Sequence, residues 1–248
     1  MGSLEPVSAI VQTSVNRVPA RLSASIDCAD YMRLGEAVDA LIDAGMDAIH
    51  VDVMDGRFVP NFGVGMSMLS VLARQRLPLD VHLMVEQPGW LFPRLAALGV
   101  RDVTVHVETT ARPFHLLQDM RRAALSPGLA FNPATPLAGL ADLMPLADRI
   151  LVMGVDPGFP GQPLVAGIGR RLRHVRRIAL STGNGTSVQV DGGVDWTTLS
   201  ELWRAGAGSF VVGTRILFSG PGTVGEQAAR VRRELARLAG EPVAVAER

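Results

Sequence analysis

The chain contains no lysine, and arginine supplies all 24 of its basic residues. Lysine forms Schiff bases with carbonyl substrates and provides the reactive amine of many enzyme sites. The absence of lysine therefore excludes lysine-based Schiff-base chemistry. It also excludes lyase or decarboxylase sites built on a lysine–aspartate array.

Cysteine, excess charge and long apolar runs are also scarce or missing. Cys28 is the only cysteine, so no disulfide forms within the chain, which fits a reducing cytoplasm. The formal net charge is zero, which favours neither nucleic acid nor an anionic membrane as a partner. No run approaches the ~20 apolar residues of a membrane helix, and the first twenty residues lack a secretory-signal pattern. We therefore expect a cytoplasmic protein without nucleic-acid or membrane partners.

Short β-rich runs alternate with amphipathic helical stretches along the chain. Eight strands are predicted, at residues 22–27, 48–54, 79–85, 103–108, 128–132, 149–155, 187–191 and 209–213. Strands that alternate with helices pair in parallel through right-handed crossovers. Eight such units in about 250 residues are typical of an α/β fold of the closed (β/α)₈ TIM-barrel type, which we predict. An open doubly wound sheet is the rival, but no G-x-G-x-x-G follows the first strand.

Length and composition fit one barrel domain. The 248 residues are 48% apolar and 19% charged, proportions typical of a globular protein. We expect residues 1–20 to be a disordered N-terminal extension, residues 21–240 to form the single barrel domain and residues 241–248 to form a loose tail.

Four residues of metal-ligand type lie near the ends of three predicted strands: His50, Asp52, His82 and Asp191. Side chains alternate along a strand, so His50 and Asp52 point the same way. Buried histidine and aspartate are costly unless they are paired or metal-bound. Two imidazoles and two carboxylates without a thiolate suit one divalent ion, Zn²⁺, Fe²⁺, Mn²⁺ or Co²⁺. The sequence therefore predicts a metal site whose two carboxylates also move protons.

The remaining histidines and Cys28 have weaker claims to this site. His106 shares the alternation of Glu108 and is expected to stand behind the ligands. His115 and His174 lie in helical stretches and are expected on solvated faces. Cys28 follows Asp27 directly, so strand alternation predicts that its thiol faces away from the barrel axis.

Three glycine-rich segments follow predicted strands six, seven and eight: "DPGFPGQ", "DGG" and "VGT". Glycine lets the backbone approach a ligand closely and turn N–H groups toward an anion. The loops after barrel strands seven and eight often bind phosphate. A phosphate site beside a metal and two carboxylates predicts proton transfer next to the carbonyl of a sugar phosphate.

Longer motifs resemble ribulose-phosphate 3-epimerases over residues 22–219. They are "SASIDCADYMRLGE", "HVDVMDGRFVPNFGVG", "DVHLMV", "FNPATP", "LVMGVDPGFPGQP", "VDGGV" and "GAGSFVVGT". The resemblance implies a metal-dependent TIM-barrel isomerase, an epimerase acting on carbohydrates, that interconverts ribulose 5-phosphate and xylulose 5-phosphate. Members are often dimers or larger, which implies a homo-oligomer.

The resemblance also implies roles for particular residues. Asp52 and Asp191 match the acid/base pair, and both belong with His50 and His82 to the metal ligands. Ser25 and His82 match substrate contacts, and Met54, Met84 and Met153 match methionines that line the site. The substrate-binding segments contain Gly158, Phe159, Pro160, Gly161, Gly192, Gly193, Gly213 and Thr214.

Four residues depart from the family pattern. Asp27 stands where an apolar residue is usual and is expected to line the site. Pro160 replaces a glycine and removes one N–H donor, Arg215 replaces a small residue, and Gly154 replaces a threonine or serine. These departures keep open a different ketose phosphate, such as that of the similar allulose-6-phosphate 3-epimerases, or a non-catalytic sugar-phosphate-binding relic.

Overall fold

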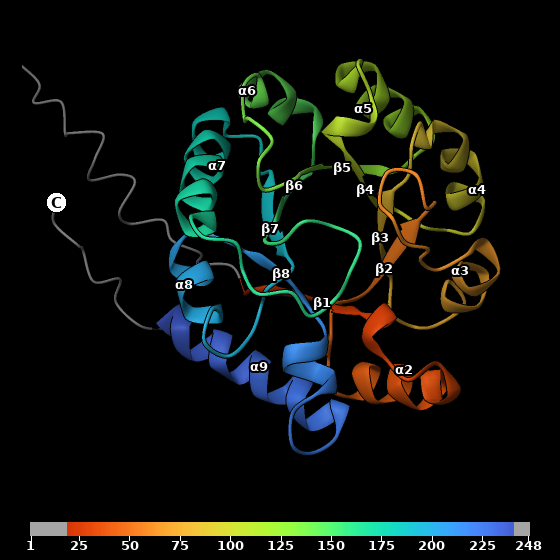
Figure 1. Cartoon of the computed structure of the whole chain (residues 1–248), viewed down its shortest axis with the longest axis vertical. Helices are drawn as coiled ribbons and strands as arrows, with labels where there is room; N and C mark the ends of the chain where they lie inside the picture. Colours follow the sequence, from red (N-terminus) through yellow and green to blue (C-terminus); the bar gives the residue numbers. More distant parts are fainter. Residues whose placement is uncertain (1–18, 241–248) are drawn as a thin grey trace, which may run out of the picture.

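Eight parallel strands close into a barrel in the order β1 to β8, and helices surround it (Figure 1). The computed structural model describes residues 19–240, so the proposed tail and nearly all of the proposed N-terminal extension lie outside them. The strands are β1 (Arg21–Ser25), β2 (Ala48–Met54), β3 (Leu79–Met84), β4 (Asp102–His106), β5 (Ser126–Phe131), β6 (Arg149–Met153), β7 (Ser187–Asp191) and β8 (Ser209–Val212). The predicted (β/α)₈ barrel is confirmed, and each predicted strand overlaps one of these.

Helices connect successive strands and cover the outside of the barrel. The α-helices are α2 (Leu34–Asp43), α3 (Met66–Leu72), α4 (Phe92–Ala97), α5 (Pro113–Arg122), α6 (Leu140–Leu143), α7 (Ile168–Thr182), α8 (Leu199–Arg204) and α9 (Val224–Gly240). Short 3-10 helices are η1 (Ile26–Cys28), η2 (Tyr31–Arg33), η3 (Pro88–Leu91), η4 (Val107–Thr109) and η5 (Met144–Leu146), and η6 (Thr214–Phe218) is a π-helix. Within residues 19–240, no helix has the length and apolar character needed to cross a membrane.

The barrel has an apolar outer layer and a polar interior. Ile49 and Val51 of β2 are fully buried and belong to the main apolar core between strands and helices. The alternate residue His50 is equally buried but lies among polar groups inside the barrel. A separate small apolar cluster contains Ala130, Leu151 and Met153. Because side chains alternate along each strand, apolar residues face the helices and polar residues face the barrel interior.

Several strand ends differ from the sequence prediction, and the end of β1 matters most for the site. β1 ends at Ser25 and the chain turns into η1, whereas the prediction continued the strand through Asp27. In the segment that follows η1, the side chain of Asp30 accepts a hydrogen bond from the backbone N of Met32 at 3.0 Å. It therefore caps the short η2 turn, and α2 begins at Leu34.

Candidate active site

The four predicted ligands meet at the carboxyl ends of β2, β3 and β7. One candidate ligand atom from each of His50, Asp52, His82 and Asp191 lies within 4.8 Å of the others. The β2–β3 register pairs Asp52 with His82, which brings these two side chains to the same level of the barrel. Residues that are up to 141 positions apart thus meet because parallel strands end at one rim.

The two imidazoles point nitrogen atoms at both carboxylates. Nε2 of His50 lies 3.3 Å from Oδ1 of Asp52 and 3.6 Å from Oδ2 of Asp191. Nδ1 of His82 lies 2.9 Å and 3.7 Å from the same two oxygens. Nε2 of His50 is buried and forms no well-formed hydrogen bond with any described residue. An orphaned nitrogen that faces two carboxylates fits a borderline divalent cation as its partner.

Charges within this cluster oppose the effect of burial. Burial raises the pKa of the Asp52 carboxyl, but the charge and hydrogen bonds of His50 and His82 outweigh it and lower that pKa. Burial likewise disfavours protonation of His50, but the charge of Asp52 and the polar contacts with Asp191, Asp52 and Asp80 raise its pKa well above the ordinary value. Asp52 is therefore held as a carboxylate.

A buried polar network supports the cluster from below. Asp80 of β3 pairs with His50 of β2, two residues before the Asp52–His82 pair. Its carboxylate accepts hydrogen bonds from Ser23 Oγ at 2.8 Å and Gln189 Nε2 at 2.7 Å. Nη1 of Arg149 donates to Asp80 at 3.0 Å, and Nη2 of Arg149 lies 3.2 Å from Asp102. Asp80, Arg149 and Gln189 were not among the site residues predicted from the sequence. The signal was present, because Asp80 precedes the inward-facing His82 by two residues.

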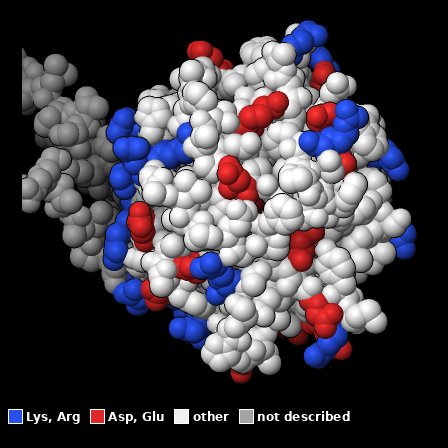
Figure 2. All heavy atoms as spheres, in the orientation of Figure 1, with Lys and Arg blue, Asp and Glu red and all other residues white. Residues whose placement is uncertain are grey.

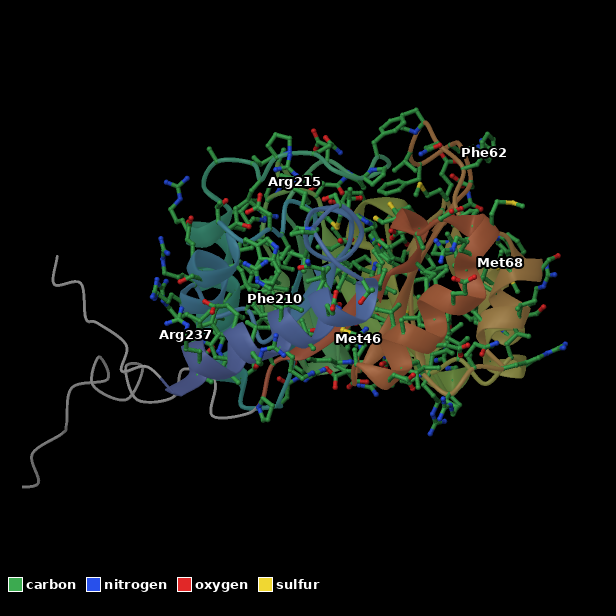
Figure 3. The ribbon with its side chains drawn as sticks, turned by 90° about the horizontal axis from the view of Figure 1, so that it is seen from below. Met46, Phe62, Met68, Phe210, Arg215 and Arg237 are labelled. Atoms are coloured by element: carbon green, nitrogen blue, oxygen red, sulfur yellow. The ribbon has the colours of Figure 1, made fainter. Side chains whose placement is uncertain are left out.

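A pocket of about 100 Å³ lies above the cluster, and almost all predicted site residues line it. These residues are Ser25, Asp27, Asp52, Met54, Met84, Met153, Gly158, Phe159, Pro160, Gly161, Asp191, Gly192, Gly193, Gly213 and Thr214. His50 and His82 are fully buried and do not line the pocket. Figure 3 shows Phe62, from the β2–α3 segment, and Arg215 at the same edge of the barrel. The roles expected for these residues are therefore compatible with their positions.

Asp27 lines the pocket, and no arginine within residues 19–240 pairs with it. Its Oδ2 accepts a hydrogen bond from the backbone N of Asp52 at 3.1 Å, and its Oδ1 accepts one from Tyr31 Oη at 3.3 Å. Burial and the neighbouring charge of Asp52 raise the pKa of Asp27 to about 7. The pocket wall thus contains a third carboxyl that changes charge near neutral pH.

The prediction for Cys28 is wrong. Its side chain lines the pocket, and Sγ lies 3.5 Å from Oγ of Ser25. The prediction assumed that strand alternation continued to residue 28. Because η1 begins at Ile26, the chain turns and brings the thiol back toward the site.

The glycine-rich segments form one side of the pocket. Gly192 has φ +87°, and a Cβ there would lie 2.5 Å from Cγ2 of Val155. Gly154, one of the departures from the family pattern, donates its N–H to the carbonyl of Asp191 at 2.6 Å. A side chain at Gly154 would collide with the carbonyl of Gly192. Packing of these loops on one another therefore requires glycine at both positions.

The loop after β6 is fastened from two sides. Nη2 of Arg215 donates to the carbonyl of Gly161 at 3.0 Å, and Nη1 lies 3.2 Å from Oδ2 of Asp195. Nδ2 of Asn61, from the segment after β2, donates to the carbonyl of Gly158 at 2.7 Å. Arg215 lines the pocket, but its charge is paired with Asp195.

The face of the molecule seen in Figure 1 carries charges of both signs. Figure 2 shows acidic side chains near its middle and basic side chains gathered at the edge formed by α7 and α8. His115 and His174 are exposed on their helices, as predicted. His106 is fully buried beside His82, with 2.8 Å between their Nε2 atoms.

Comparison with known proteins assigns the chain to a family. The sequence model of the "Ribulose-phosphate 3 epimerase family" matches residues 21–217. The chain belongs to the ribulose-phosphate 3-epimerase family. A ribulose-phosphate 3-epimerase from Buchnera aphidicola is 40% identical over 195 residues, which are 78% of this chain and 86% of that protein. The ribulose-phosphate 3-epimerase of Escherichia coli K12 is 40% identical over 197 residues, covering 79% and 88%.

Membership of the ribulose-phosphate 3-epimerase family confirms the predicted enzyme class, a carbohydrate epimerase among the isomerases. A more distant solved structure, KGPDC from Streptococcus mutans, has a TM-score of 0.66 at 13% identity and covers 90% of this chain and all of its own. At that identity the similarity concerns the fold alone.

Proposed function

We propose that this chain is a metal-dependent 3-epimerase of a ketose phosphate and that its substrate is D-ribulose 5-phosphate, with D-xylulose 5-phosphate as the product. One observation carries the proposal: Asp52 and Asp191 enter the same site from β2 and β7, with both imidazoles beside them. Two carboxylates that approach from different strands can serve the two faces of one carbon atom. Family membership supports the same reaction.

In this proposal the two aspartates exchange protons with carbon 3 of the ketose. One carboxylate removes the proton next to the carbonyl, and the electron pair moves toward the carbonyl oxygen to give an enediolate. The other aspartate, protonated beforehand, returns a proton to the opposite face and inverts the centre. The reverse reaction exchanges the roles of the two residues.

The residues present fit one divalent cation. His50 Nε2, His82 Nδ1, Asp52 and Asp191 would hold it, and Zn²⁺, Fe²⁺, Mn²⁺ and Co²⁺ all suit these donors. When bound, such an ion stabilises negative charge that develops on the substrate oxygens. The two carboxylates also leave the ion close to neutral overall, because each contributes one negative charge.

We assign the substrate phosphate to the glycine-rich side of the pocket. Gly192, Gly193, Gly213 and Thr214 line it, and their backbone N–H groups suit an anion. Ser25 is assigned to a substrate hydroxyl, and the methionines to an apolar wall that excludes water from the reacting carbon. Pro160 provides no N–H, so the segment from Gly158 to Gly161 contributes one donor fewer.

Asp27 supports a second candidate substrate. A carboxyl in the pocket wall offers a hydrogen-bond acceptor for an additional substrate hydroxyl. A hexulose phosphate such as allulose 6-phosphate has one more hydroxyl than the pentulose. Comparison of kcat/KM for the two substrates decides between them.

The function is tested by turnover of ribulose 5-phosphate and allulose 6-phosphate after chelation and after separate addition of the four metals. We expect activity to disappear with chelator and to return with metal. Deuterium incorporation at carbon 3 in D₂O is measured in parallel. Failure of every ketose phosphate with metal supplied would contradict the function, and tight binding without deuterium exchange would favour the non-catalytic relic.

A further inference from the structure

A chain of hydrogen-bonding side chains extends from the candidate metal centre to the loop after β5. Nδ1 of His82 faces Asp52, and its Nε2 lies 2.8 Å from Nε2 of His106. Nδ1 of His106 lies 3.1 Å from Oε2 of Glu108. Both imidazoles are fully buried, and their rings stack with centroids 4.9 Å apart.

At the outer end of this row of side chains, the donors and acceptors of the hydrogen bonds are fixed by Glu108. Oε1 of Glu108 accepts a hydrogen bond from the backbone N–H of Asn132 at 2.8 Å and another from the hydroxyl of Thr135. A backbone N–H can only donate, so Oε1 must accept. The carbonyls of Asn132 and Thr135 are in turn held by Nη2 of Arg171, at 3.2 and 2.5 Å. The loop therefore presents Glu108 to His106 in one orientation.

Each proton position then follows from the previous one. Glu108 is an ionised carboxylate and offers only acceptors, so Nδ1 of His106 carries the proton of their shared hydrogen bond. Full burial of the His106 ring disfavours a second proton, which would make the ring a charged imidazolium. Its Nε2 therefore has a lone pair. Two ring nitrogens at 2.8 Å share one proton, so Nε2 of His82 must donate.

We infer that Glu108 and His106 are positioning residues that fix His82 in the tautomer protonated at Nε2, which leaves the Nδ1 lone pair free to bind the metal ion. Outer partners of this kind orient histidine ligands and set which nitrogen binds the metal. The inference rests on the proposed metal centre. It gives His106 and Glu108 a definite task, which is to act through His82 without touching the substrate.

The substitution Glu108→Gln should reverse the direction of these hydrogen bonds, and it keeps the size and shape of the side chain. In Glu108→Gln, the N–H of Asn132 still requires an acceptor, so the amide oxygen of the glutamine must face Asn132 and its NH₂ group must face His106. Nδ1 of His106 then accepts, and its Nε2 carries the proton. Nε2 of His82 must accept in turn, so the proton of His82 moves to Nδ1 and blocks the metal-binding lone pair.

The experiment measures metal affinity and tautomers separately. Co²⁺ is titrated into the chelator-treated full-length wild type, Glu108→Gln and Glu86→Gln, by calorimetry and visible absorbance. Glu86→Gln is the matched control, because it removes a half-exposed carboxylate near the end of β3 that pairs with Arg57. We expect Glu108→Gln to weaken Co²⁺ binding by about 10–100-fold and Glu86→Gln to leave it unchanged. Equal affinity of the two variants would overturn the inference.

Imidazole ¹⁵N chemical shifts of the Zn²⁺-loaded wild type provide the second readout, which does not depend on the variant folding. We expect the Nδ1–H form of His106 and the Nε2–H form of His82. The reverse pair of tautomers in the wild type would also overturn the inference. Neither readout requires turnover, so a protein with these tautomers and tight Co²⁺ binding that turns over no ketose phosphate would contradict the proposed function alone.

Discussion

Nδ1 of His50 lies 3.3 Å from Oδ2 of Asp80, and both side chains are fully buried inside the barrel. Burial raises the pKa of the Asp80 carboxyl, but the charge of Arg149 and the contacts with His50 and Gln189 lower it well below the ordinary value. Asp80 is thus an ionised carboxylate that holds one nitrogen of His50, while the other nitrogen faces Asp52 and Asp191.

Asp80→Asn should destabilise the protein substantially. Arg149, 4% exposed at its side chain, would lose one of its two carboxylate partners and keep Asp102. Removal of one partner from a buried pair typically costs ~3–5 kcal/mol, and we expect the lower end, about 3 kcal/mol, because Asp102 remains. Urea unfolding of the metal-free protein measures this. Asp148→Asn, which breaks the exposed pair with Arg121, is the control and should cost less than ~1 kcal/mol. Equal losses in the two variants would show that burial of Asp80 does not matter.

Replacing either proposed acid/base residue by asparagine should abolish most epimerisation. Positioned proton transfer contributes typically ~10²–10⁴-fold, so we expect kcat to fall by about that factor in Asp52→Asn and in Asp191→Asn. Each variant keeps one carboxylate and should exchange the carbon-3 proton of only one of the two epimers in D₂O at saturating Co²⁺. NMR of each epimer measures the exchange. If both variants exchange both epimers, another base performs the reaction.

Asp27 should make stability depend on pH. Burial and the charge of Asp52 raise its pKa to about 7 in the folded protein, above the ~3.9 of an unfolded chain. Ionisation of Asp27 therefore costs stability progressively from about pH 4 to about pH 7, and the full cost applies above pH 7. Asp27→Asn removes this cost and keeps an acceptor for the N–H of Asp52. Relative to wild type, the metal-free variant should gain more unfolding free energy at pH 8 than at pH 5. Asp39→Asn, at an exposed position of α2, is the control, and a gain equal at both pH values would refute the prediction.

Gly63 and Gly65 should respond differently to alanine. A Cβ at Gly63 would collide with the carbonyl of Asp52 and lie 2.9 Å from the backbone N of Met54. The end of β2 must then shift, and we expect a loss of ~1–3 kcal/mol together with weaker Co²⁺ binding. A Cβ at Gly65 meets no atom of the described residues within 4 Å, and φ there is −84°. Gly65→Ala should stay within ~0.5 kcal/mol of wild type. Denaturation and Co²⁺ titration of both variants test this, and identical behaviour would disprove the proposed contact.

Strand alternation predicted the metal-ligand cluster because the two-residue period of a strand is fixed by its backbone. The rule that turned His50 and Asp52 inward also applies to Asp80, Arg149 and Gln189, which share the alternation of His82, Met153 and Asp191. The alternation does not reveal that these three side chains meet one another, because their contacts depend on the closed barrel and its register. The sequence therefore predicted the upper layer of the interior but not the charged layer below it.

Cys28 shows where this reasoning fails. A two-residue error in the end of β1 reversed the expected direction of the thiol, because alternation has no meaning once η1 begins. Strand ends depend on local turns that propensity locates poorly. Glu108 lies in η4, beyond the end of β4, yet it still contacts His106 as alternation suggested. The η4 turn brings Glu108 to His106, although the strand does not continue to residue 108 as predicted.

The hydrogen bond from Asn61 to Gly158 joins residues that are 97 positions apart in the chain. It fastens the segment after β2, which carries the exposed Phe62, to the segment after β6, which carries the exposed Phe159. The bond thus joins two loop segments at one side of the pocket entrance. An outward movement of either segment alone would break this bond, so we expect the two segments to move together when that side of the pocket opens.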